Sequence, residues 1–318
     1  MTSRPTPAPP PESGPPGAVT ETSGEGSGEG SGEERAAGGG SDRATADLLD
    51  RFLAGLRLRL PRLRALWAHG SLAGGDYQQG RSDLDLIAIV DRPCTPDEER
   101  QLGALHTTLD RTDPLAAKLH CSYLAADETA EPARIHLTWA HRELMRRTVT
   151  PVTRRELHTF GRVLHGDDTP AALLPPVTDA QLAAYIATDL RDYWRPTLED
   201  PDLWLQDIWV DLGLLTLARA TVTLRDGTLI SKGEALAVLG ELGAPDEVIA
   251  DIRNRRYGPA APPPPPGPAR PPGPARPPGP ARPSDALTRR ADLTRAFLGP
   301  ALDRTLATYG HNSPTPQG

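Results

Sequence analysis

Several features that commonly define a protein's class are scarce in this chain. Only two of its 318 residues are cysteines, Cys94 and Cys121, which is too few for a disulfide framework. No run of eighteen apolar residues occurs and the start of the chain lacks the apolar segment of a signal peptide, so we expect a cytoplasmic protein without a membrane span. The net charge of −7 argues against nucleic-acid binding, which requires basic side chains to neutralise phosphates. We expect a monomer.

Proline and glycine, by contrast, are abundant and concentrated in two segments. Residues 1–41 contain "PTPAPPPESGPPG" and "SGEGSGEGSGEE", which offer almost no large apolar side chains to bury, and we interpret them as a disordered tail. Residues 259–283 contain near-tandem copies of "GPARPP". Glycine recurs there every six residues and not every three, which excludes a collagen helix and favours a stiff polyproline II linker.

The segment from residue 42 to 150 shows both helical and strand periodicity. Its pattern predicts an amphipathic helix over residues 44–60 and another over 96–110. Four apolar runs between and after these helices are typical of strands. In chain order they are "LRALWAHG", "DLDLIAIV", "AAKLHCSYLA" and "ARIHLTWA". The fold class expected for this segment is therefore α/β, or more broadly α+β, with a mixed sheet.

The remainder of the folded chain has helical periodicity only. "TDAQLAAYIATDLRDYW" and "LWLQDIWVDLGLLTLARATVTL" both predict long helices, and Ser231 with Glu234 forms a capping box at the start of another. We expect an all-α bundle over residues 151–258, completed by a terminal helix within residues 284–312. The segment "RRELHTFGRVLHG" was expected to be a surface helix followed by a turn.

The stretch "HGSLAGGDYQQGRSDLDL" carries the strongest signal for chemistry. Asp83 and Asp85 alternate with leucines along a strand, so both carboxylates project from one face. Two carboxylates of this kind suit Mg²⁺, which accepts one or two protein carboxylates together with substrate phosphates. Gly70 allows close approach of the backbone, and Ser71 with the amides after it can bind outer phosphates. The sequence therefore predicts a metal-bound nucleotide site.

These residues resemble the signature of the DNA polymerase beta-type nucleotidyltransferase superfamily. "LLTLARATVTLRDGTLISKGEAL" resembles a segment of the aminoglycoside 3''/9 adenylyltransferases, which adenylylate streptomycin and spectinomycin. The resemblance implies antibiotic resistance through transfer of AMP from Mg-ATP to a small acceptor. It also implies that Asp83 and Asp85 are catalytic metal ligands and that Lys232 reaches the triphosphate. The implied nucleotide-binding residues are Gly70, Ser71, Ser82, Asp83, Asp85 and Lys232.

The acceptor implied by the resemblance is a cationic small molecule. Asp207 and Asp211 share one helix face, and together with Trp139 they are the candidate residues for binding it. Trp204 and Trp209 have a spacing that suits core packing equally well.

A proton acceptor is harder to find. The family has a glutamate on the strand where this chain has His120, which can act as a base near neutral pH but is a poor magnesium ligand. Asp113 is an alternative base, and a site without a base is a third possibility. The missing carboxylate supports one rival function, a nucleotide-binding regulatory module that turns over slowly or not at all. A second rival, of the same fold, is a protein-modifying nucleotidyltransferase.

Overall fold

The computed structural model describes residues 32–259 and 284–310. The expected disordered tail up to residue 31 and the proline-rich linker from residue 260 to 283 lie outside this range. Helix α1 begins at Gly32, so residues 32–41 are helical and do not belong to the tail as expected. The "EERAA" part of this segment favours a helix, because glutamate, arginine and alanine are good helix formers, whereas the "GGG" that follows it does not.

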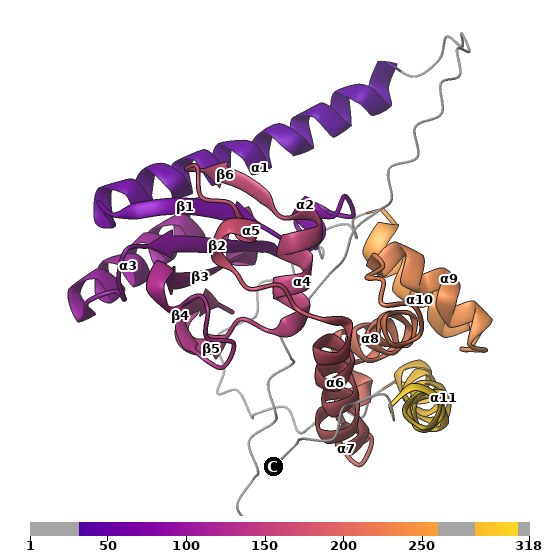
Figure 1. Ribbon diagram of the computed structural model, residues 1–318. Helices are drawn as coiled ribbons and strands as arrows, with labels where there is room; N and C mark the ends of the chain where they lie inside the picture. Colours follow the sequence, from indigo (N-terminus) through magenta and orange to yellow (C-terminus); the bar gives the residue numbers. More distant parts are fainter. Residues whose placement is uncertain (1–31, 260–283, 311–318) are drawn as a thin grey trace, which may run out of the picture.

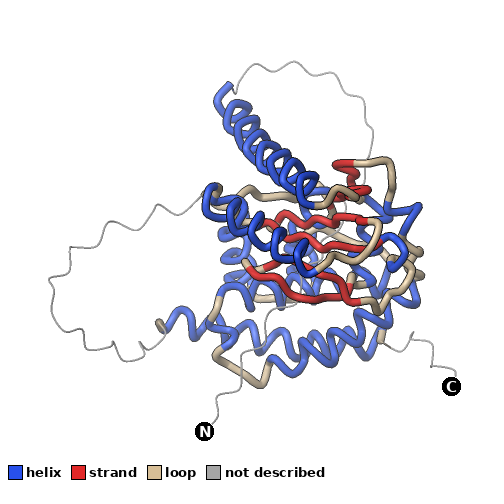
Figure 2. Tube along the Cα trace, turned by 90° about the vertical axis from the view of Figure 1, so that its left-hand side faces the viewer, coloured by secondary structure: helices blue, strands red, loops and turns tan. Residues whose placement is uncertain are grey.

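The first half of the chain forms a mixed sheet, as predicted from the sequence, and this sheet has six strands. The strand order is β5-β4-β3-β2-β1-β6, with β2 and β3 parallel and the other neighbours antiparallel. Figure 2 shows the strands side by side with helices around them. The strands are β1 (Leu63–Ala68), β2 (Leu84–Val90), β3 (Leu119–Ala125), β4 (Ile135–Ala140), β5 (Glu143–Thr148) and β6 (Arg162–His165).

Helices cover both faces of this sheet, and more helices gather beside it (Figure 1). The helices of the first half are α1 (Gly32–Arg59), α2 (Gly70–Ala73), α3 (Pro96–Thr112), α4 (Pro151–Phe160) and α5 (Pro170–Leu173), with short 3-10 turns at Pro114–Lys118 and Ala126–Glu128. Those of the second half are α6 (Asp179–Asp189), a π-helical turn (Leu190–Trp194), α7 (Arg195–Thr197), a 3-10 turn (Leu203–Leu205), α8 (Asp207–Asp226), α9 (Lys232–Glu241), α10 (Asp246–Tyr257) and α11 (Asp285–Tyr309).

The central strand β2 divides its side chains between two cores. Leu84 and Leu86 pack in the cluster formed with α1 and α3. Ile87 and Ile89 pack in a smaller cluster on the other face, with residues of α4. Because side chains alternate along a strand, Asp83 and Asp85 lie on the α4 face. The strand therefore buries its apolar residues on both faces and presents two carboxylates at its start.

Two strands and the position of α4 were not expected from the sequence. The four residues of β6 pair with β1, so the sheet continues past residue 150, where the helical domain was expected to begin. Helix α4 is also no surface helix, because Arg154 is 2% exposed and Glu156 is fully buried. None of the four residues of β6 is fully buried, so this strand has no alternating pattern of buried apolar residues by which it could be predicted.

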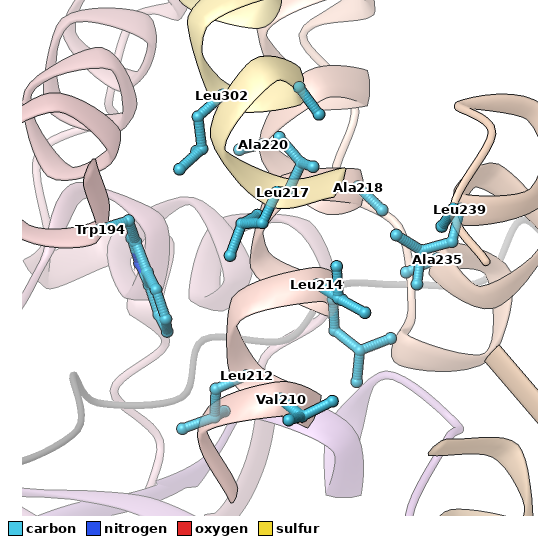
Figure 3. Close-up of a cluster of buried hydrophobic side chains, with 14 of the residues drawn as sticks. Trp194, Val210, Leu212, Leu214, Leu217, Ala218, Ala220, Ala235, Leu239 and Leu302 are labelled. Carbon is cyan, nitrogen blue, oxygen red and sulfur yellow. The ribbon is translucent and has the colours of Figure 1, made fainter. Parts of the chain in front are cut away.

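The second half is organised around α8. Twelve of its residues are buried, and they pack against α6, α9 and α11 (Figure 3). Trp204 and Trp209 are buried in this core. Gly213 is required there, because a Cβ at this position would lie 2.7 Å from the Trp204 ring. Helix α9 begins at the capping box predicted for Ser231 and Glu234. No helix within residues 32–259 or 284–310 is both long and apolar enough to cross a bilayer.

Candidate active site

The turn between β1 and α2 brings the backbone into contact with a carboxylate of β2. The His69 amide donates a hydrogen bond to the Asp85 carbonyl (3.0 Å). Gly70 adopts a φ of +59°, and a Cβ there would lie 2.5 Å from Asp85 Oδ2. Both the left-handed backbone and the close approach require glycine. The Gly-Ser motif and the Asp-x-Asp motif thus meet at a single point.

Ser71 and Ser82 lie at the two ends of the segment that joins these motifs. Ser71 is in the first turn of α2 and is partly exposed, so its hydroxyl and the following amides are accessible to a phosphate. Ser82 is only 3% exposed, and its Oγ accepts a hydrogen bond from the Gln78 amide (3.0 Å). The predicted nucleotide contact of Ser82 is therefore not supported. Its hydroxyl stabilises the loop that leads into β2.

Asp83 and Asp85 each face a basic side chain from the region of β3. Lys118 Nζ lies 3.4 Å from Asp83 Oδ1, and His120 Nδ1 lies 3.6 Å from Asp85 Oδ1. The parallel register pairs Asp85 directly with His120. Burial lowers the pKa of His120, but the hydrogen bond and charges from Asp85 and Asp83 outweigh it, so its pKa lies above the ordinary value. The predicted base is thus beside the predicted metal ligands.

The donor set at this point suits magnesium better than a softer metal. No group of three or more His, Cys, Asp or Glu side chains within the described ranges is arranged to hold a metal ion. The two carboxylates lie on one face of β2. Gly70 has no Cβ, which would otherwise fill the space beside Asp85, so this space is left for substrate oxygens. Magnesium usually binds through one or two carboxylates and phosphates, so these residues fit it.

A cavity of about 210 Å³ opens from the two carboxylates towards β3, β4 and β5. It reaches His69 on one side and Arg147 of β5 on the other, and α8 contributes Ile208 and Leu212. Thr150 and Thr153, at the start of α4, also line it. The sheet, α4 and α8 therefore enclose one cavity that contains both predicted metal ligands and His120.

Asp76, in the loop after α2, connects this loop to the helical half. Its carboxylate accepts hydrogen bonds from the Gly233 amide (3.2 Å), Arg256 (2.9 Å) and the Tyr257 hydroxyl (2.8 Å). Gly233 directly follows Lys232, the first residue of α9. The two motifs recognised in the sequence, about 150 residues apart, are consequently neighbours in space.

A buried ion pair under the Gly-Ser turn was missed in the sequence. His69 Nδ1 lies 3.0 Å from Glu156 Oε2, and Arg219 of α8 lies 3.8 Å from Glu156 Oε1. Burial raises the pKa of Glu156. Burial lowers the pKa of His69, but the hydrogen bond to Glu156 and the charges of Asp85 and Glu156 together outweigh it, so the net shift is upward. In the sequence, only the position of His69 beside the Gly-Ser motif could have indicated a role for this histidine. Its partner Glu156 is 87 residues away, so no local pattern links the two residues.

Trp139 does not line the cavity. It is buried on the opposite face of β4, where its ring stacks on His106 of α3 with centroids 4.6 Å apart. Its neighbours Thr138 and Ala140 are the residues that line the cavity. The structure therefore does not support the predicted contact of Trp139 with an acceptor, because side chains alternate along a strand and Trp139 lies on the face away from the cavity.

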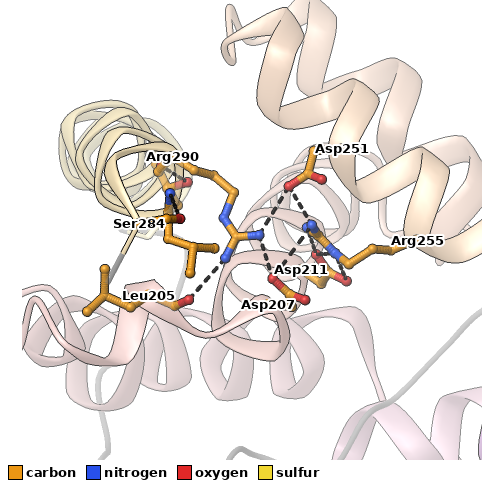
Figure 4. Close-up of polar contacts among 9 residues, drawn as sticks. Leu205, Asp207, Asp211, Asp251, Arg255, Ser284 and Arg290 are labelled. Atoms are coloured by element: carbon orange, nitrogen blue, oxygen red, sulfur yellow. Dashed lines mark hydrogen bonds and ion pairs between the residues drawn. The ribbon is translucent and has the colours of Figure 1, made fainter. Parts of the chain in front are cut away.

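Asp207 and Asp211 form ion pairs with arginines of the same chain (Figure 4). Arg255 pairs with Asp211 at 2.5 Å and with Asp251, while Arg290 pairs with Asp207 and, at 3.2 Å, with Asp251. Burial raises the pKa of Asp211, and Arg255 opposes this shift. These carboxylates join α8, α10 and α11, so the structure does not support their predicted role in binding a cationic acceptor.

Asp113, the alternative base, has a structural role. Its carboxylate accepts a hydrogen bond from the Leu115 amide (2.9 Å) at the start of a 3-10 turn, and it pairs with Arg51 of α1. It does not line the cavity described above. Of the two side chains considered as base, His120 is the one that the fold places beside Asp85.

The chain combines a six-stranded mixed sheet with a helical C-terminal region. No family model matches this sequence, and no curated protein matches it. A solved structure with the same architecture is the crystal structure of spectinomycin adenyltransferase AAD(9) from Enterococcus faecialis with ATP and spectinomycin. It superposes with a TM-score of 0.58 over 81% of this chain and 99% of that chain, at 15% sequence identity. At this identity the likeness establishes the fold.

Proposed function

We propose that this protein is a nucleotidyltransferase that transfers AMP from ATP to a hydroxyl group of a small acceptor. The observation that carries the proposal is the close approach of Gly70 to Asp85, which lines a cavity together with Asp83 and His120. The similar fold of an adenyltransferase solved with ATP supports it. Asp76 supports it further, because it holds the start of α9, and with it Lys232, against the loop that follows Ser71.

In the proposed reaction, an acceptor hydroxyl oxygen forms a bond to the α-phosphorus of ATP. The bond from that phosphorus to the oxygen bridging to the β-phosphate breaks, and pyrophosphate leaves. Magnesium, held by Asp83 and Asp85, would neutralise negative charge that develops on the phosphates. Ser71 and the amides of α2 would bind the leaving pyrophosphate, and Lys232 would add a mobile positive charge.

His120 is the proposed acceptor of the hydroxyl proton. A general base must lie within hydrogen-bond reach of the proton that it removes, and His120 faces the cavity next to Asp85. Asp85 orients the imidazole through Nδ1, which leaves Nε2 to receive the proton. A neutral imidazole is needed for this step, so the proposed activity rises as pH increases through the pKa of His120.

Incubation with ATP labelled at the α-phosphate and a panel of hydroxyl-bearing acceptors tests this proposal. Asp85→Asn should abolish transfer of label. Asp91→Asn is a matched control, because Asp91 directly follows the other end of β2 and is exposed. Loss of activity in both variants, or in neither, would contradict the assigned role of Asp85.

A second candidate function is nucleotide binding without turnover. It is favoured by one observation, namely that β3 carries no carboxylate facing Asp85 and presents His120 instead. Stabilisation by ATP of the folded protein, without label on any acceptor, would support this alternative.

If His120→Gln reduces transfer by less than about tenfold, His120 is not the base, since general bases typically contribute about 10²–10⁴-fold.

A further inference from the structure

The cavity beside Asp85 has a charge that does not suit a cationic acceptor. Apart from Asp83 and Asp85, the charged side chains that line it within the described part of the chain are Lys118 and Arg147. His120 and His141 lie there too, with ring centroids 5.1 Å apart. Once a divalent ion binds the two carboxylates, the remaining formal charge on the walls is positive.

For the proposed reaction, the position of the cavity makes it the acceptor side of the site. Gly70 and Ser71 follow β1, whereas the cavity extends from β2 across β3, β4 and β5. In an in-line displacement the attacking and leaving oxygens lie on opposite sides of the phosphorus. With the pyrophosphate bound beside Ser71, the attacking hydroxyl therefore approaches from the β3 side, which is where the cavity lies.

Among the described residues, the helical half brings no negatively charged side chain to the cavity wall. Ile208 and Leu212 are the residues of α8 that line the cavity. Their neighbours Asp207 and Asp211 are instead paired with Arg290 and Arg255 (Figure 4). The wall that α8 presents to the acceptor is consequently apolar.

Arg147 is the side chain best placed to recognise an anion. It is half-buried, and its Nε donates a hydrogen bond to Met145 Sδ (3.0 Å). No carboxylate among the described residues lies within ion-pair distance of its guanidinium, whereas its neighbour Arg146 pairs with Glu99 on the opposite face of the sheet. A guanidinium carries its charge at any physiological pH and binds carboxylates and phosphates through two parallel hydrogen bonds.

We propose that the acceptor is a small anion, a hydroxyl-bearing molecule with a phosphate or carboxylate group that binds Arg147. This inference rests on the proposed function, since it names the acceptor class of that same site. The cavity volume of about 210 Å³ is smaller than that of pockets for drug-sized ligands, which usually span roughly 300–1,000 Å³. A small acceptor is consistent with this volume. Ser122 and Thr138, whose hydroxyls are 2.9 Å apart on the cavity wall, supply polar contacts for an acceptor.

Calorimetric titration of the full chain, with magnesium and α,β-methylene ATP present, tests the proposal. The probes are glucose 6-phosphate for a phosphate group, gluconate for a carboxylate, glucose as a neutral control and streptomycin as a cation. We expect at least one anionic probe to bind more tightly than glucose and streptomycin. Whichever of the two binds more tightly identifies the preferred anionic group.

Variants of the two neighbouring arginines separate charge recognition from folding. Arg147→Gln should weaken binding of the anionic probe by about tenfold or more, as expected for loss of a hydrogen bond to a charged group. Arg147→Lys should weaken its binding by less. Arg146→Gln, on the opposite face, should leave its binding within about twofold. Equal melting temperatures of Arg147→Gln and Arg147→Lys show that lost binding is not lost folding.

Three results would overturn the inference. The first two are tighter binding of streptomycin than of both anionic probes, and no binding of either anionic probe. The third is an Arg147→Gln variant that no longer binds the ATP analogue but still binds the anionic probe. Failure of the proposed function is distinguishable from these. In that case no α-label from ATP reaches any acceptor in the transfer experiment, whereas the anionic probe still binds the unmodified protein in an Arg147-dependent manner.

Discussion

Substitution of Gly70 by alanine should damage the site far more than the same change at Gly75. Both residues have left-handed φ values, +59° for Gly70 and +78° for Gly75, and placing a Cβ in this region costs about 1–2 kcal/mol. At Gly75 nothing lies within 4 Å of the added atom, whereas at Gly70 it would lie 2.5 Å from Asp85 Oδ2. The two variants therefore share the backbone strain and differ in the collision with the carboxylate.

The expected stabilities follow from this difference. Gly75→Ala should lose about 1–2 kcal/mol and Gly70→Ala about 2–3 kcal/mol, because the carboxylate or the turn must also move. For a folded region of this size, each kcal/mol lowers the melting temperature by roughly 2–4 °C. Thermal unfolding followed by circular dichroism measures both values.

Binding of ATP separates the two variants more sharply than stability does. Gly75→Ala should bind Mg-ATP nearly as tightly as the unmodified protein. Gly70→Ala should bind it at least about tenfold more weakly, because Asp85 no longer occupies its position beside the turn. Equal affinities in the two variants would refute the argument that the contact between Gly70 and Asp85 forms the nucleotide site.

Three further predictions concern buried charges and the contact between the two halves. Glu156→Ala should lower the free energy of unfolding by about 3 kcal/mol in urea denaturation, because it leaves His69 unpaired in the interior; Glu156→Gln, which keeps the volume, should cost less. Burial lowers the pKa of His106 to about 3, so the unfolded chain, with a histidine pKa near 6.5, takes up the proton first as pH falls. The free energy of unfolding should therefore decrease below pH 6.5, by about 2 kcal/mol at pH 5. If a His106→Gln variant shows the same loss of stability between pH 7 and 5, His106 is not its cause. Asp76→Ala should weaken ATP binding without loss of the folded state, since it releases α9 from the loop after α2; unaltered affinity in a titration would show that this contact does not position Lys232.

The parts of the site that could be predicted are those encoded by short, local patterns. Asp83 and Asp85 are recognisable because period-two alternation places both on one face of an apolar strand. Gly70 is recognisable because a turn with positive φ selects glycine. The capping box that begins α9 is equally local.

The parts that could not be predicted depend on tertiary partners. Trp139 was proposed to bind the acceptor from the family resemblance, because the local sequence does not show which face of β4 meets α3. Asp207 and Asp211 lie on one helix face as expected, yet the arginines that pair with them come from α10 and α11. Local sequence gives no sign of a cation supplied by a distant helix. The same limit concealed the pairing of His69 with Glu156.

The measurement that tests the central claim most directly compares ATP labelled at the α-phosphate with ATP labelled at the γ-phosphate. Each is incubated with the protein, magnesium and the acceptors named above, and the products are separated. The account predicts that α-label is transferred to an acceptor while γ-label appears only in pyrophosphate. Transfer of γ-label to the acceptor would contradict it, because phosphoryl transfer would then replace adenylyl transfer. Absence of transfer of either label, with ATP bound, would leave nucleotide binding as the function.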